Sequence, residues 1–179
     1  MMASIATQTF RAGRAGLLGS CVGVLLVWRT GLLSAAPSAI GLTMLAASDH
    51  ATRRIPRNTI VRTAWWTAVG ALVDAARLSA WDRLATASVL AVLVGLVAAA
   101  IWLVSSGIAF GDVKLLALAA FVPAWLRSSA IVTMVAVALM AAACVVVFKG
   151  IRSGSIAATS TIAFGPPLLV GWLVGVLTA

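Results

Sequence analysis

Two aspartates in this chain stand at the edges of strongly apolar stretches. Asp112 follows a glycine and opens the run 113–126, in which Lys114 is the only charged residue. Asp49 directly follows a second apolar stretch over residues 31–48. Because an ionisable side chain at membrane depth costs several kcal/mol, such residues are candidates for a functional site.

Two converging carboxylates can hydrolyse a peptide bond without a metal or a cofactor, and we expect neither here. Like charges a few ångströms apart cannot both ionise, so one carboxyl keeps its proton. The ionised one takes a proton from water, and the protonated one hydrogen-bonds the scissile carbonyl and then helps the amine to leave. Burial favours the protonated form, whereas Lys114 and a helix start favour the Asp112 anion. The sequence leaves open which effect dominates.

Simpler interpretations stand beside this one. Asp112 could be a structural carboxylate, paired with Lys114 or capping the helix that it opens. Asp49 could be a solvated residue at a helix end, paired with Arg53 four positions on, and such exposed pairs contribute less than about 1 kcal/mol. Asp74 and Arg77 have the spacing of a surface i, i+3 pair.

Composition places the chain in a membrane. It has 179 residues, of which 63% are hydrophobic and 9% charged, and its mean hydropathy is +1.13. A soluble domain has about a quarter of its residues charged. We therefore expect an all-α polytopic transmembrane bundle. Cys21, Cys144 and the single His50 are too few and too scattered for a zinc site or a disulfide framework.

About seven helices are expected, because a span needs about 20 apolar residues. We divide the chain into an N-terminal transmembrane helix, 1–30, and a six-helix core, 31–179. Pro37 should kink the second span, and Gly165-Pro166-Pro167 should break the last one, over 156–178. The expected spans are 12–28, 31–48, 58–76, 84–104, 113–126, 130–148 and 156–178.

The net charge of +9 follows the positive-inside rule rather than the pattern of a nucleic-acid-binding patch, so no nucleic-acid partner is expected. With a cytoplasmic N-terminus, Asp49 and Asp112 lie on the cytoplasmic side and Asp74 and Asp82 on the other. The cytoplasmic side then holds nine positive side chains: Arg11, Arg14, Arg53, Arg54, Arg57, Arg62, Lys114, Lys149 and Arg152. The other side holds four: Arg29, Arg77, Arg83 and Arg127.

Two glycines precede the second aspartate. Gly107 and Gly111 would let a neighbouring backbone approach closely, or would adopt conformations closed to other residues. Small residues in membrane helices also serve packing, which is the alternative explanation.

Three motifs together resemble the type IV prepilin peptidase family, the Gly-x-Gly-Asp intramembrane aspartyl proteases that include the preflagellin peptidases. Gly111-Asp112-Val113-Lys114 is similar to the family's Gly-x-Gly-Asp segment. Pro56 follows Asp49 by seven positions in a basic loop, as in the family, and Phe164-Gly165-Pro166 is similar to its Phe-Gly-Pro segment. The three motifs occur in the family's order and extend over residues 49–168.

The resemblance implies catalytic roles for Asp49 and Asp112, with Gly107, Gly111, Lys114 and Pro56 in supporting or substrate-binding roles. It implies cleavage of the basic leader of a prepilin or pseudopilin at the cytoplasmic face of a bacterial inner membrane. Ala109 replaces the first glycine of the motif, which puts local backbone flexibility in question. The cysteine tetrad of the longer members is missing, so N-methyltransferase activity is not expected.

Two other functions use the same residues differently. A small proton-coupled transporter would relay protons through the aspartates, with inverted repeats and broken helices meeting at mid-membrane. A non-catalytic membrane assembly factor would tolerate the loss of both carboxylates.

Overall fold

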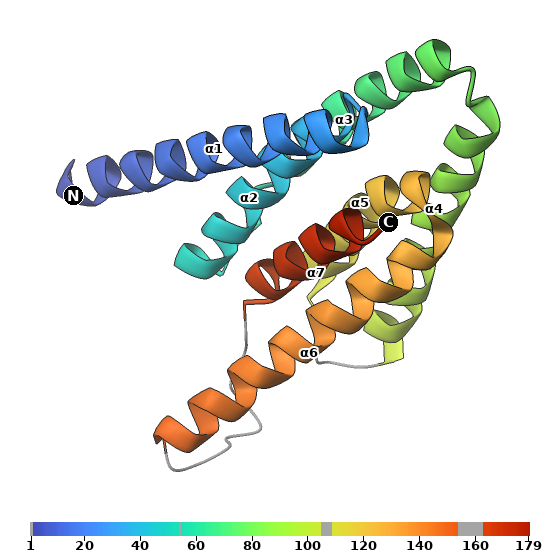
Figure 1. Cartoon of the computed structure of the whole chain (residues 1–179). Helices are drawn as coiled ribbons and strands as arrows, with labels where there is room; N and C mark the ends of the chain where they lie inside the picture. Colours follow the sequence, from blue (N-terminus) through green and yellow to red (C-terminus); the bar gives the residue numbers. More distant parts are fainter. Residues whose placement is uncertain (1, 54, 105–108, 154–162) are drawn as a thin grey trace.

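The computed structural model describes residues 2–53, 55–104, 109–153 and 163–179 (Figure 1). Over these ranges the backbone forms seven α-helices and no strand, which confirms the prediction of an all-helical chain. The helices are α1 (Met2–Thr30), α2 (Ala35–Thr52), α3 (Arg57–Leu78), α4 (Trp81–Val104), α5 (Phe110–Leu126), α6 (Ser128–Ser153) and α7 (Gly165–Leu177).

Two of these helices are long and apolar enough to cross a bilayer. They are α4 and the Ser128–Arg152 part of α6, and the shorter α7 is also apolar. Most side chains of α4 face outward: Val89, Val92, Leu96 and Val97 are all more than half exposed. An exposed row of large aliphatic side chains on a long helix is expected where lipid replaces water. These features are consistent with a membrane protein.

Small residues bring α1 against α2. A Cβ atom added to Gly19 would lie 2.8 Å from Ile40 Cα, and one added to Gly23 would lie 3.1 Å from Ala36 Cα. Gly19 and Gly23 form a Gly-x-x-x-Gly pair, the spacing that lets two membrane helices approach closely. The two helices pack against each other, and Figure 1 shows them lying together near their connection and diverging toward the C-terminal end of α2.

Small and hydroxylated residues also join α2 to α3. The hydroxyls of Ser38 and Thr67 are hydrogen-bonded at 2.9 Å, and both side chains are buried. Gly41 faces the Thr63 side chain so closely that a Cβ atom would overlap it. Hydroxyl pairs and glycines are the contacts that hold helices together where the hydrophobic effect between them is weak.

Asp74 has a different role from the predicted one. Its ion pair with Arg77 exists, at 3.8 Å, but the Asp74 side chain is fully buried rather than at the surface. Its two oxygens accept the backbone N–H groups of Leu33 and Ser34, each at 2.9 Å. These are donors at the start of α2 that have no partner within the helix. Asp74 of α3 therefore caps the N-terminus of α2.

The prolines bear on two predicted helix defects, a kink at Pro37 and a break at Gly165-Pro166-Pro167. Pro37 lies in the first turn of α2, where the missing N–H group costs no hydrogen bond, so the predicted kink is wrong. Pro166 and Pro167 likewise lie at the start of α7. The last helix thus begins at Gly165 after two non-helical residues, which agrees with the predicted break at this segment. Most of the preceding part of the predicted span, residues 154–162, lies outside the described residues.

The last helix packs against α6 through a second Gly-x-x-x-Gly pair. A Cβ atom on Gly175 would lie 3.0 Å from the Ala130 carbonyl oxygen, and one on Gly171 would lie 2.8 Å from the Ala138 nitrogen. The α7 helix also contacts α2 and α5. It therefore connects the helices that carry Asp49 and Asp112.

Candidate active site

Asp49 lies in the last turn of α2 and is buried, with 6% of its surface exposed. Its Oδ2 accepts the backbone N–H of Gly165 at 2.7 Å, across 116 positions of sequence. Gly165 is the first residue of α7, so the carboxylate lies at the positive end of that helix dipole. The Gly165 N–H group and the positive end of the α7 dipole therefore both face the Asp49 carboxylate.

The start of α7 has few other donors to offer. Pro166 and Pro167 carry no N–H group, and the N–H of Leu168 already binds the Phe164 carbonyl at 3.0 Å. The Gly165 N–H is therefore the first-turn donor directed at the Asp49 carboxylate. A Cβ atom on Gly165 would lie 3.0 Å both from Asp49 Oδ2 and from Ala46 Cα. Glycine is needed here for close approach.

Asp112 lies in the first turn of α5 and is partly buried. Its Oδ2 accepts the N–H of Ala109 at 3.3 Å, a long hydrogen bond that caps its own helix. Burial raises the pKa of the Asp112 carboxyl, the Ala109 hydrogen bond lowers it, and the negative charge of Asp49 raises it further. The two aspartates, 63 positions apart in sequence, are therefore close enough to interact electrostatically.

The segment between α2 and α3 brings the first motif against the second. Ile55 is partly buried, and its Cδ1 would lie 3.3 Å from a Cβ atom on Gly111. Pro56 follows at the N-cap of α3, with φ −65° and ψ 121°, and its carbonyl accepts the N–H of Ile60 at 3.2 Å. Pro56 thus ends the connection and directs Ile55 toward the helix that carries Asp112.

Gly111 is explained by this close approach and not by an unusual conformation. Among the residues whose backbone is described, the glycine with positive φ is Gly31, at 71°. Gly111 has ordinary helical geometry with Ile55 packed against it. The companion prediction for Gly107 falls outside the described residues.

Lys114 does not act as a counter-ion for Asp112. Its Nζ lies 4.4 Å from the centre of the Phe110 ring, and that ring packs against Trp102 of α4 at a centroid distance of 5.1 Å. Within the described part of the chain, no ion pair joins Lys114 to Asp112. A cation over an aromatic ring contributes about 0.5–1 kcal/mol at an exposed site. This contact fixes the α4–α5 end of the site, and it leaves Asp112 without a neutralising partner from Lys114.

Ala109 explains how the chain departs from a Gly-x-Gly-Asp pattern. It is the N-cap of α5, with φ −79° and ψ 146°, a conformation that any residue adopts. The change from glycine therefore costs no backbone strain at this position.

The hydrogen bond from Gly165 to Asp49 is not among the contacts that the sequence predicts. The Phe164-Gly165-Pro166 segment stands out as a motif and suggests a broken helix, but the contact with Asp49 depends on tertiary packing. The motif itself is the sequence feature that could have indicated this hydrogen bond. A glycine before two prolines offers a single N–H group at the start of a helix.

The site thus has two carboxyl groups of unequal environment, at the ends of two helices that contact each other. One accepts a hydrogen bond at a helix N-terminus, and the other has a raised pKa because of burial and its neighbour's charge. Pairs whose environments separate their protonation states are suited to general acid and base catalysis on water.

Comparison with known proteins gives one assignment. No curated protein and no solved structure matches the chain. A family model described as the type IV leader peptidase family matches residues 37–148, which is well over half of the chain. The match contains Asp49, Pro56, Gly111, Asp112 and Lys114 and ends before Gly165. The chain belongs to the type IV leader peptidase family, whose members are proteases.

Proposed function

We propose that the chain is an intramembrane aspartyl endopeptidase that removes the basic N-terminal leader of a prepilin or pseudopilin. The observation that carries this proposal is the packing of α2, α5 and α7, which brings the end of α2 with Asp49 toward the start of α5 with Asp112 and sets Ile55 against Gly111. A structural capping role for either residue requires no such convergence of the two helix ends. The family membership supports a leader peptidase in general, and the site residues are our assignment.

The two carboxyl groups take different roles in this mechanism. Asp49, bonded to the Gly165 N–H, is the ionised group and accepts a proton from the attacking water. Asp112, with its raised pKa, keeps its proton and donates a hydrogen bond to the scissile carbonyl oxygen. As the tetrahedral intermediate collapses, the proton that Asp49 took passes to the leaving amine. The residues themselves supply both proton transfers.

The substrate class fits the location of the site at helix ends. Asp49 is in the last turn of α2 and Asp112 in the first turn of α5, so both lie where apolar helices meet loops. A peptide bond just before a hydrophobic helix reaches that level when the helix is inserted in the bilayer. The charge bias of the chain supports a cytoplasmic location for this side, and cleavage of a prepilin would take place at a bacterial inner membrane. A basic leader is attracted to the acidic pair.

Cleavage of a co-expressed prepilin tests the proposal. Asp49→Asn and Asp112→Asn should each abolish cleavage while the protein still accumulates in the membrane. Asp82→Asn is the matched control, because Asp82 is an exposed aspartate in the first turn of α4 and should be dispensable. Full activity in either of the first two variants would rule out the acid–base pair.

Orientation has a separate test. Alkaline phosphatase fused after Ala80, in the α3–α4 connection, should be active because that connection is expected outside the cytoplasm. The same enzyme fused within the α2–α3 connection at Ile55 should be inactive. The reverse pattern would contradict the proposed cytoplasmic site.

A further inference from the structure

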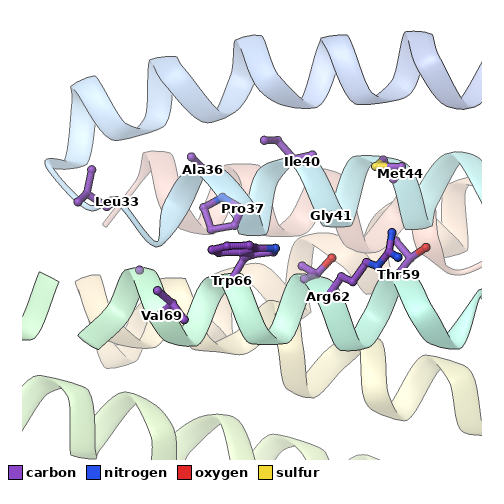
Figure 2. Close-up of a pocket in the computed structure, with 12 residues that line it drawn as sticks. Leu33, Ala36, Pro37, Ile40, Gly41, Met44, Thr59, Arg62, Trp66 and Val69 are labelled. Carbon is purple, nitrogen blue, oxygen red and sulfur yellow. The ribbon is translucent and has the colours of Figure 1, made fainter. Parts of the chain in front are cut away.

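A groove of about 530 Å³ lies between α2 and α3, away from the two catalytic candidates (Figure 2). Its walls are mainly apolar, with Pro37, Ile40 and Met44 on α2 and Trp66 and Val69 on α3. Figure 2 shows the Trp66 indole facing the Pro37 ring across the groove. Trp66 is 60% exposed, so the groove opens onto the outer face of these two helices.

One end of the groove is cationic. Arg62 lines it together with Thr59, and Figure 2 shows the Arg62 side chain turned toward Thr59, near the start of α3. Among the described residues no carboxylate lies within ion-pair distance of Arg62. The nearest aspartates along the chain have other partners: Asp49 accepts from Gly165, and Asp74 from Leu33 and Ser34. A guanidinium in this setting suits a phosphate group, which it can bind through two parallel hydrogen bonds.

The length of the groove matches one leaflet of a bilayer. From Arg62 to Gly70, eight residue steps along α3, the groove extends for about 12 Å at 1.5 Å per residue. The apolar half-thickness of a bilayer is about 15 Å. The cation therefore lies at headgroup level when the apolar part of the groove lies among acyl chains.

We propose that this groove binds one anionic phospholipid, with the headgroup phosphate on Arg62 and the Thr59 hydroxyl and one acyl chain between Pro37 and Trp66. Charge selects this occupant over a peptide. A basic leader would be repelled by Arg62, whereas the anionic lipids of the cytoplasmic leaflet are attracted by it. The inference does not depend on the proteolytic activity, because it uses only the α2–α3 surface.

The test uses the full chain purified in detergent, with phosphatidylglycerol or phosphatidylcholine added. Native mass spectrometry should find phosphatidylglycerol retained several-fold more than phosphatidylcholine. Arg62→Gln should reduce phosphatidylglycerol retention to the phosphatidylcholine level, and Trp66→Ala should reduce retention of both lipids. Thermal unfolding of each variant, with and without lipid, verifies that it is folded and gives an independent reading of lipid stabilisation.

Two variants serve as matched controls for Trp66→Ala and Arg62→Gln. Trp65 is as exposed as Trp66, at 66%, but does not line the groove, so Trp65→Ala should keep wild-type retention. Arg83→Gln removes an exposed arginine on α4 and should also have no effect. Equal retention of the two lipids by the wild type, or unchanged selectivity in Arg62→Gln, would overturn the proposal. A photo-crosslinker at position 40 that captures a co-expressed prepilin instead of phospholipid would also overturn it.

Discussion

The backbone N–H of Gly165 donates to Oδ2 of Asp49 at 2.7 Å, so the first residue of the last helix holds the carboxylate in the last turn of the second one. This bond joins two segments that both carry family-like motifs. It fixes one oxygen of Asp49 in a buried position and directs the α7 dipole at it. Position 165 should therefore control the geometry of the site without taking part in the chemistry.

Gly165→Ala should lower prepilin cleavage at least about tenfold, which corresponds to about 1.4 kcal/mol of transition-state stabilisation. The new methyl group would lie 3.0 Å from Asp49 Oδ2 and from Ala46 Cα, tighter than ordinary van der Waals contact. Either the carboxylate or the start of α7 must move, and the hydrogen bond lengthens. Cleavage rate and membrane accumulation, measured together, separate this effect from misfolding.

Gly16→Ala is the control for that variant. A Cβ atom on Gly16, within α1, has no neighbour within 4 Å, and alanine is the better helix former. Its activity should equal that of the wild type. If Gly165→Ala is as active as Gly16→Ala, the contact with Asp49 has no catalytic importance.

Asp74→Asn should destabilise the protein without affecting the chemistry. The Asp74 carboxylate accepts two buried N–H groups at the start of α2, and an amide would present its own NH₂ to one of them. Leaving one such donor unsatisfied costs about 1–3 kcal/mol. The unfolding temperature in detergent should fall by several degrees, while cleavage per folded molecule stays near wild type. If Asp74→Asn and Asp49→Asn lower the unfolding temperature and the cleavage per folded molecule to the same extent, both aspartates are only helix caps.

Gly19→Ile should separate α1 from α2. The side chain would begin 2.8 Å from Ile40 Cα, a backbone atom that cannot yield without moving the helix. We expect a lower unfolding temperature and reduced yield from the membrane. Gly16→Ile, three residues away and in open space, should be tolerated. Identical behaviour of the two variants would show that the Gly19–Gly23 pair does not hold α1 in place.

Ala109→Gly restores the more usual Gly-x-Gly-Asp sequence and should change little. Since Ala109 has φ −79° and ψ 146°, glycine gains no conformation that the site uses. Its extra freedom in the unfolded chain costs about 0.4–1 kcal/mol. Cleavage rates within about twofold of wild type are expected, with slightly lower thermal stability. A large gain in activity would mean that the site needs a backbone conformation closed to alanine.

Local patterns predict the helices well and single out the candidate aspartates, because both depend on short-range sequence. The long apolar runs form helices, and the Asp49–Pro56 and Gly111–Lys114 motifs are recognisable from residue types and spacing alone. Short-range sequence does not predict which residues form contacts in the folded protein when they are far apart in the chain. The Gly165 donor joins positions 116 apart, and the burial of Asp74 follows from how closely Gly70 lets α3 approach Ser34. The kink predicted at Pro37 is wrong because the effect of a proline depends on where the helix begins.

Protonation of Asp112 tests the acid–base pair without an activity assay. Asp112 lies in the first turn of α5, outside the two helices that are long and apolar enough to cross the bilayer. Because burial and the charge of Asp49 both raise its pKa, the carbonyl band of the protonated acid in infrared spectra should titrate above the ordinary range of an aspartate. The band should disappear in Asp112→Asn.

The direction in which the Asp49 charge shifts the titration midpoint of Asp112 is a more specific test of the pair. A negative charge at Asp49 disfavours a second one at Asp112, so Asp49→Asn should move the titration midpoint of Asp112 to lower pH. Burial and the Ala109 hydrogen bond remain in that variant, so the shift reports the Asp49 charge. Asp82→Asn, which removes a charge from the first turn of α4, should leave the midpoint unchanged. If Asp49→Asn and Asp82→Asn give the same midpoint, the two candidate catalytic carboxyl groups do not interact, and the proposed division of roles between them fails.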